Sequence, residues 1–225
     1  MRYFFVLLFF FSYSVSTAEA HIPVLVEQSS LHDITRIETP EITHAYYGTL
    51  KDFPHTYEIV SREPFTLFAE VLMPDKKESE TIVSGIIIRE VSGGGRVTEV
   101  ARMLARDATW DSFYEPIGGD RYLRGTSYEG EQPAGIYRIE VTAPDNDQKY
   151  VLVVGKREDF GNIGYFESVR RVAGVKAFFG KSRIMVIQSP LVYVPLLLLV
   201  LIGGCIYYRR KQNNKNSDSS KKVIQ

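Results

Sequence analysis

Residues 133–155, PAGIYRIEVTAPDNDQKYVLVVG, carry the clearest structural signal in the chain. Between 136 and 141 apolar residues alternate with charged ones, which is the period of a strand that buries one face. Residues 143–147 read APDND and predict a turn, because Pro, Asp and Asn favour turn conformations. The apolar run at 150–155 predicts a second short strand. The stretch is therefore two strands joined by a turn.

Short strands of the same kind are predicted along the preceding part of the chain. They cover 45–50, 56–60, 65–72, 82–91, 97–104 and 110–115. Turn residues separate them, and the lack of a helical pattern between them argues against a parallel α/β fold, which needs crossover helices. We therefore predict a mainly β fold, an antiparallel, jelly-roll-like β-sandwich in which two twisted sheets each bury one face.

The pattern becomes helical after Phe160. Over 164–179 most apolar residues share one broad face of a helix. Lys176 is an exception because it lies among them, and Gly180 is placed to end the helix. Three positions are open for this amphipathic helix: packed on its own sandwich, in the headgroup layer of a membrane, or against a partner helix.

Both ends of the chain point to a membrane. Residues 191–208, LVYVPLLLLVLIGGCIYY, carry no charge and are followed at once by Arg209-Arg210-Lys211, which predicts one transmembrane helix with a cytoplasmic end. Residues 1–20 combine Arg2, an apolar run and Ala18-Glu19-Ala20, as a secretory signal with its cleavage site does. We expect a single-pass protein of the cell membrane, with its N-terminal domain outside and its tail in the cytoplasm.

These patterns divide the chain into six predicted parts. They are a signal peptide at 1–20, an N-terminal arm at 21–42, the β-sandwich at 43–158, the amphipathic helix and a linker at 159–183, the transmembrane segment at 184–208, and a basic tail at 209–225.

Charge and cysteine content exclude some classes of function. The segment 21–208 holds 20 basic and 25 acidic residues, a net charge of −5, which argues against nucleic acid as a partner. The only cysteine, Cys205, lies in the predicted span. The external domain therefore has no disulfide, and its stability must come from burial.

We find no arrangement of residues typical of catalysis or of a metal site. The four histidines, at 21, 32, 44 and 55, lack the close spacing of a zinc site. The turns Asp145–Asp147 and Gly118–Asp120 are rich in oxygen ligands, so Ca²⁺ is an alternative there to plain turns. We otherwise expect no cofactor.

An aromatic cluster is the best candidate for binding. Five rings fall within nineteen positions: Trp110, Phe113, Tyr114, Tyr122 and Tyr128. If exposed, such rings stack on sugars or anchor a protein interface; if buried, they belong to the sandwich core. We take four of them as candidate ligand-binding residues: Trp110, Tyr114, Tyr122 and Tyr128.

Three passages resemble the bacterial pre-peptidase C-terminal (PPC-like) domains. Residues 45–59 are similar to the opening hairpin of that family, 133–141 to its late turn and strand, and 149–155 to its last strand. The resemblance covers 43–156. It implies a β-sandwich that serves as an attachment, folding or binding module, although such domains usually follow an enzyme and this chain shows no catalytic domain.

We therefore expect a membrane-anchored, extracytoplasmic and non-catalytic module that mediates binding, adhesion or assembly at the cell envelope. Its partners would be the lipid bilayer and other envelope proteins or glycans. Two alternatives stay open: a carbohydrate-binding receptor that uses the aromatic cluster, and an unrecognised hydrolase, for which Glu115 with Asp120 or Glu129 would be examples of paired acids.

Overall fold

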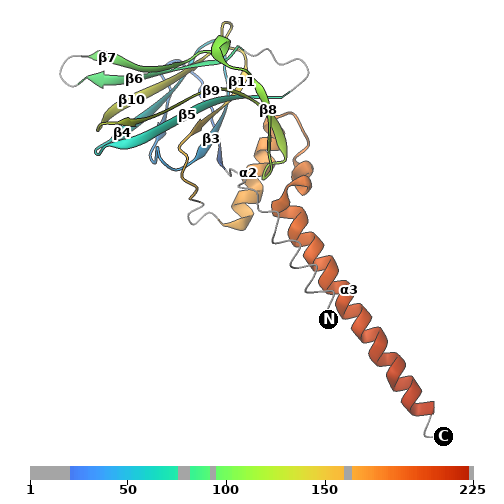
Figure 1. Ribbon diagram of the computed structural model, residues 1–225. Helices are drawn as coiled ribbons and strands as arrows, with labels where there is room; N and C mark the ends of the chain where they lie inside the picture. The colour runs from blue at the N-terminus through green and yellow to red at the C-terminus, as the bar shows by residue number, and fades with distance from the viewer. Residues whose placement is uncertain (1–20, 76–81, 92–94, 160–163, 223–225) are drawn as a thin grey trace.

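The computed structural model describes residues 21–75, 82–91, 95–159 and 164–222. The predicted signal peptide lies outside these residues. Eleven strands in the described part form the two sheets of a sandwich (Figure 1). The first sheet has the order β1 (Ile22–Leu25), β3 (His44–Thr49), β11 (Lys149–Val154), β5 (Phe65–Pro74), β9 (Asp120–Gln132) and β8 (Asp111–Glu115). The second has the order β2 (Ile34–Ile37), β4 (His55–Ser61), β10 (Gly135–Thr142), β6 (Ser84–Val91) and β7 (Arg96–Met103).

The core lies between the sheets and follows the predicted alternation. In β10, Tyr137, Ile139 and Val141 are fully buried, while Arg138 faces outward and forms ion pairs with Glu58 and Glu90. The mainly β sandwich predicted from the sequence is confirmed, with antiparallel pairing except at two short edge strands.

Strands that are neighbours in sequence often lie in opposite sheets. The 143–148 segment carries the chain from β10 in the second sheet to β11 in the first. The turn at 50–54 likewise joins β3 to β4, so the passage that resembles an opening hairpin is an inter-sheet connection here. Both arrangements let each strand bury apolar residues in the shared core.

The N-terminal segment differs from the predicted arm. Within 21–42, β1 pairs with β3 and β2 pairs with β4, both in parallel, so the segment adds an edge strand to each sheet. Between them, the buried side chain of Gln28 exchanges hydrogen bonds of 2.9 and 3.0 Å with the backbone of Thr56. Four-residue strands are too short to show a period, which explains why the sequence pattern missed them.

The longest strand, β9, was also missed. Its 13 residues pair along β5 on one side and β8 on the other, with a bulge near Glu70. Many of its residues are polar or half-buried, because part of the outer face of the first sheet stays open to solvent. The sequence therefore shows no clean alternation there.

The amphipathic helix packs on its own sandwich. Helix α2 (Tyr165–Phe178) covers the outer face of the first sheet through Val175 and the neighbouring Phe179, which contact Tyr47, Tyr122 and Val153. The part of the first sheet under α2 is thus buried on both faces, whereas among the described residues no helix packs on the outer face of the second sheet (Figure 1).

The C-terminal helix leaves the sandwich directly after a short 3₁₀ helix. The segment predicted as a span at 184–208 begins with this 3₁₀ helix, η2 (Arg183–Gln188), and only then continues as α3 (Pro190–Lys222). The stretch Pro190–Gln212 is long and apolar enough to cross a membrane, and its most apolar part is not buried inside the protein. Figure 1 shows α3 projecting away from the sandwich.

Candidate functional site

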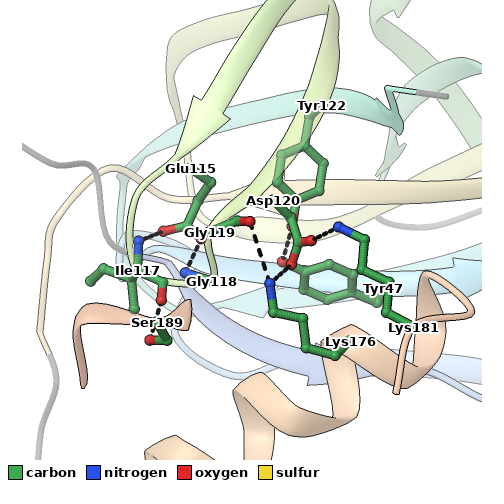
Figure 2. Close-up of polar contacts among 10 residues, drawn as sticks. All are labelled: Tyr47, Glu115, Ile117, Gly118, Gly119, Asp120, Tyr122, Lys176, Lys181 and Ser189. Atoms are coloured by element: carbon green, nitrogen blue, oxygen red, sulfur yellow. Dashed lines mark hydrogen bonds and ion pairs between the residues drawn. The ribbon is translucent and has the colours of Figure 1, made fainter. Parts of the chain in front are cut away.

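The tip of the β8–β9 hairpin lies where the sandwich, α2 and the start of α3 meet (Figure 2). Glu115 ends β8 and Asp120 begins β9, and the two are register partners. The connecting residues form a tight loop in which the Gly119 amide donates to the Glu115 carbonyl at 2.9 Å. Gly119 has a positive φ of 70°, which glycine adopts without strain. We call this region the junction.

Asp120 joins the hairpin to α2. Its Oδ2 lies 2.9 Å from the Nζ of Lys176, and its Oδ1 lies 2.6 Å from the Nζ of Lys181. Lys176 also donates to the carbonyl of Gly119 at 3.3 Å. The side chains of Asp120 and Lys176 are buried, and a buried charge is tolerated when it is paired and hydrogen-bonded. One carboxylate therefore bonds both the last turn of α2 and Lys181, three residues beyond the end of that helix.

Glu115 holds the loop itself. Its carboxylate accepts hydrogen bonds from the amide of Ile117, at 2.8 Å, and from the amide of Gly118. Burial raises the pKa of Glu115 above its ordinary value, although the two amides oppose the shift. The loop can approach this carboxylate because residue 118 is glycine: a Cβ there would lie 2.6 Å from Oε2.

Ser189 joins the hairpin to α3. Its side chain is fully buried, and its hydroxyl donates to the carbonyl of Ile117. The same oxygen accepts from the amide of Leu191 at 3.3 Å, as a helix N-cap does, and Pro190 takes the first helical position. The residue that precedes α3 is thus bonded directly to the β8–β9 hairpin of the sandwich.

Aromatic side chains surround these polar contacts. Tyr47 and Tyr122 share a hydrogen bond of 2.9 Å between their hydroxyls, and both rings pack against Phe179. Burial raises the pKa of both hydroxyls, so they stay protonated at neutral pH. In the junction, the charged groups are paired with other groups of the protein and the aromatic rings are packed. This arrangement is suited to hold elements together rather than to bind a small substrate.

The four candidate binding rings do not share a surface. Tyr122 is buried under α2, whereas Trp110 and Tyr128 pack against the inter-sheet core. The indole N–H of Trp110 donates to the carbonyl of Ala105 in the short helix η1 (Ala105–Asp107), at 2.9 Å. Only Tyr114 is half exposed, with Arg121 over its ring. A ligand-binding role for these residues stays a prediction, and of the four rings that of Tyr114 is the most accessible to a ligand.

The predicted oxygen-rich turns contain side chains that are bonded within the protein, and the histidines do not gather at one place. Asp120 bonds two ammonium groups, and the side chain of Asn146 accepts hydrogen bonds from Thr142 and Ala143. His44 and His55 lie in different sheets, so the eleven-residue spacing does not bring them together. Within the residues that the structure describes, no three His, Cys, Asp or Glu side chains gather as a metal site.

Sequence reasoning missed the junction but contained one sign of it. Lys176 falls on the apolar face of the predicted helix, and a lysine in that place needs a buried acid. The sequence could not name Asp120, which lies 56 residues away. Ser189 gave no signal, since a Ser-Pro before a helix is a common start.

The fold and the junction together define a class: a β-sandwich followed by a C-terminal helix that is long and apolar enough to span a membrane. No protein-family model and no curated protein matches the chain.

Two solved structures are similar to this chain. One is the pre-peptidase C-terminal domain of a collagenase from Bacillus anthracis, with 10% identity and a TM-score of 0.34, covering 56% of this chain and 98% of that one. The other is the mitogen derived from Yersinia pseudotuberculosis, with 17% identity and a TM-score of 0.33, covering 54% of this chain and 92% of that one. The first belongs to the family that the sequence resembles, and both similarities concern the fold alone.

Proposed function

We propose that this chain is a single-span membrane protein whose β-sandwich works outside the cytoplasm as a non-catalytic module for binding or assembly at the cell envelope. The length and apolar character of Pro190–Gln212 support the membrane anchor. The basic residues Arg209–Lys211 at the far end of that stretch support a cytoplasmic tail, because cytoplasmic flanks are enriched in Lys and Arg.

The observation that carries the proposal is the direct attachment of α3 to the sandwich. Ser189 contacts Ile117 of the hairpin, and Lys176 in α2 contacts Asp120. A flexible linker would let the sandwich turn freely, whereas these contacts hold it in one orientation relative to α3. A fixed orientation is useful to a module that presents one face to a partner in or near the same membrane.

The burial and the bonding of two acidic side chains support a non-catalytic role. Glu115 and Asp120, one of the acid pairs that a hydrolase could use, are both buried and bonded to groups of the protein itself. General acid–base catalysis needs a carboxyl within hydrogen-bond reach of a substrate. Because both carboxyls are buried, neither is within hydrogen-bond reach of a substrate in this structure.

The orientation is tested by protease protection. The full chain, tagged at its C-terminus, is expressed in cells. Proteinase K is then added so that it reaches the outer face of the membrane that α3 crosses but does not enter the cytoplasm. We expect the sandwich to be digested and the tail tag to survive until the membrane is dissolved. A tag lost from sealed cells beside an intact sandwich would contradict the proposal.

The binding role is tested by crosslinking in membranes, followed by recovery through the tail tag. The matched variant carries a Gly-Ser insertion between Gln188 and Ser189, which leaves the sandwich sequence intact and frees its orientation. We expect specific envelope proteins to be recovered with the natural chain and far less of them with the insertion. Equal recovery would show that the fixed orientation is not needed.

A further inference from the structure

A small apolar surface is exposed beside the start of α3. It consists of Phe166 in the first turn of α2 and of Ile184 and Ile187 in η2, which are 85%, 76% and 52% exposed. We call these three residues the juxtamembrane surface. Because η2 packs against α2, the three side chains lie on neighbouring elements, and large exposed apolar side chains next to a membrane helix favour a contact with something apolar.

The position of this surface identifies what covers it. The hydroxyl of Tyr165, which precedes Phe166, donates to the carbonyl of Leu191 in the first turn of α3, at 2.7 Å. Figure 1 shows the N-terminal end of α2 and η2 beside the beginning of α3. Ile187 is three residues before Pro190, and the chain is extended at Ser189, so the two residues lie at most roughly 11 Å apart. The headgroup layer on each side of a bilayer is roughly 5–8 Å thick, so Ile187 lies in or next to this layer when α3 enters the hydrocarbon near Pro190.

Basic side chains accompany the apolar ones. Arg183 begins η2 and Arg170 lies one turn along α2 from Phe166; both are exposed. With Arg171 they line a groove of about 520 Å³ between α2, η2 and β1. Glu167 bonds Arg170 and Arg171, so three cations face one anion in this groove. The excess of positive charge complements an anionic phosphate at the membrane surface.

We infer that the juxtamembrane surface inserts into the headgroup layer of the same bilayer that α3 crosses, with Arg183 and Arg170 against anionic lipid headgroups. The inference rests on the proposed membrane anchor. It gives the sandwich a second contact with the membrane beside the span. Helix α2 then has two roles, since its buried face holds the sandwich and its first turn meets lipid.

The test places one fluorescent label at a time on the full chain in lipid nanodiscs. Cys205→Ser removes the only native cysteine. Phe166→Cys, Ile184→Cys and Ile187→Cys then each carry an NBD label, and the nanodiscs contain lipid with a nitroxide quencher near the headgroup. Val60→Cys is the matched control, since Val60 is 59% exposed on β4, and Leu198→Cys reports the span itself.

We expect headgroup-level quencher to reduce the emission at 166, 184 and 187 about threefold more than at 60, because these residues lie in the interface. Labels at 166, 184 and 187 that quench no more than the label at 60, beside a lipid-exposed label at 198, would overturn the inference alone. That result includes a surface covered by protein, where the label is shielded but not quenched. A label at 198 that meets no lipid would overturn the membrane anchor as well.

The charge contribution is tested on the Ile184→Cys chain with and without Arg183→Gln. We expect quenching to be stronger in nanodiscs of phosphatidylglycerol than in those of phosphatidylcholine, and Arg183→Gln to remove about half of that difference, because each basic residue near the surface adds to the attraction. Quenching that is equal in the two lipids would overturn the role of the arginines. Equal thermal unfolding midpoints of both chains would show that the change acts at the surface.

Discussion

The ammonium group of Lys176 lies 2.9 Å from the carboxylate of Asp120, and water reaches neither side chain. One residue belongs to the helix on the outer face of the sandwich and the other to the strand beneath it. Removing two charges from water is costly, and their attraction offsets that cost only in a well-formed pair. The pair therefore stabilises one position of α2 and disfavours neighbouring ones.

Lys176→Met should destabilise the protein by about 3 kcal/mol, because Asp120 is left buried with only Lys181 as a partner. Chemical denaturation of the full chain in mild detergent measures this, followed by the fluorescence of Trp110, the only tryptophan. The exposed pair of Lys156 and Glu129 provides the control: Lys156→Met should cost less than about 1 kcal/mol.

The double variant Lys176→Met with Asp120→Leu should recover most of the lost stability, to within about 1 kcal/mol of the natural chain, because apolar residues of similar size replace a buried pair well. If the double variant is less stable than Lys176→Met alone, Asp120 matters to the fold through Lys181 or the hairpin rather than through Lys176. The pair would then not be what positions α2.

A second prediction concerns the end of β11. Gly155 has a φ of 83°, and a Cβ there would lie 2.4 Å from the carbonyl oxygen of Ile42. Gly155→Ala should cost about 3 kcal/mol, because both the backbone angle and a backbone contact oppose it. Gly95 has a φ of 65° with open space around its Cβ position, so Gly95→Ala isolates the cost of the angle, about 1 kcal/mol. Equal losses in denaturation of the two variants would show that the contact with Ile42 is unimportant.

The sequence predicted the sandwich where alternation was strong. In β5, for example, Phe65, Leu67, Ala69 and Val71 face the inter-sheet core as their period of two requires. It failed for β9 because parts of that strand face solvent, and for β1 and β2 because they are too short to show any period. Local pattern carries information about burial, and these strands are held mainly by pairing with distant neighbours.

The site was harder to predict for the same reason. A pattern along α2 places Lys176 on its apolar face, but the partner that makes this acceptable comes from a hairpin far away in sequence. The aromatic residues illustrate the reverse case: Trp110, Tyr122 and Tyr128 are close in sequence, yet they pack in different layers of the fold. Proximity along the chain is a poor guide to a shared surface in a β-sandwich.

A third prediction concerns pH. The ring of His55 is buried in the core, where its Nδ1 lies 2.8 Å from the hydroxyl of Tyr150. Burial, and then the charge of Lys51, lower the pKa of His55 below its ordinary 6.5. The unfolded chain therefore binds a proton more readily than the folded one, and the free energy of unfolding falls as pH drops below 6.5 toward the lower pKa of the folded state.

His55→Gln should remove that part of the pH dependence, which denaturation curves between pH 7.5 and 5 would measure. His32→Gln, at an exposed position, should keep the dependence of the natural chain. If His55→Gln loses stability with falling pH as steeply as the natural chain does, the acid sensitivity comes from another group.

The last prediction concerns the attachment of α3. Ser189→Ala removes the hydroxyl that donates to the carbonyl of Ile117 and accepts from the amide of Leu191. Loss of a helix cap costs about 1 kcal/mol, and a buried carbonyl left without a donor adds a similar amount. Hydrogen exchange in nanodiscs should therefore quicken by about tenfold or more in segments 115–120 and 189–193, since 1.4 kcal/mol corresponds to a factor of ten. Ser182→Ala is the matched control, because Ser182 precedes η2 without a side-chain capping bond. Faster exchange at 189–193 alone would mean that Lys176 and Asp120 hold the hairpin without Ser189, so that the rigid connection between sandwich and membrane helix depends on the ion pair rather than on the cap.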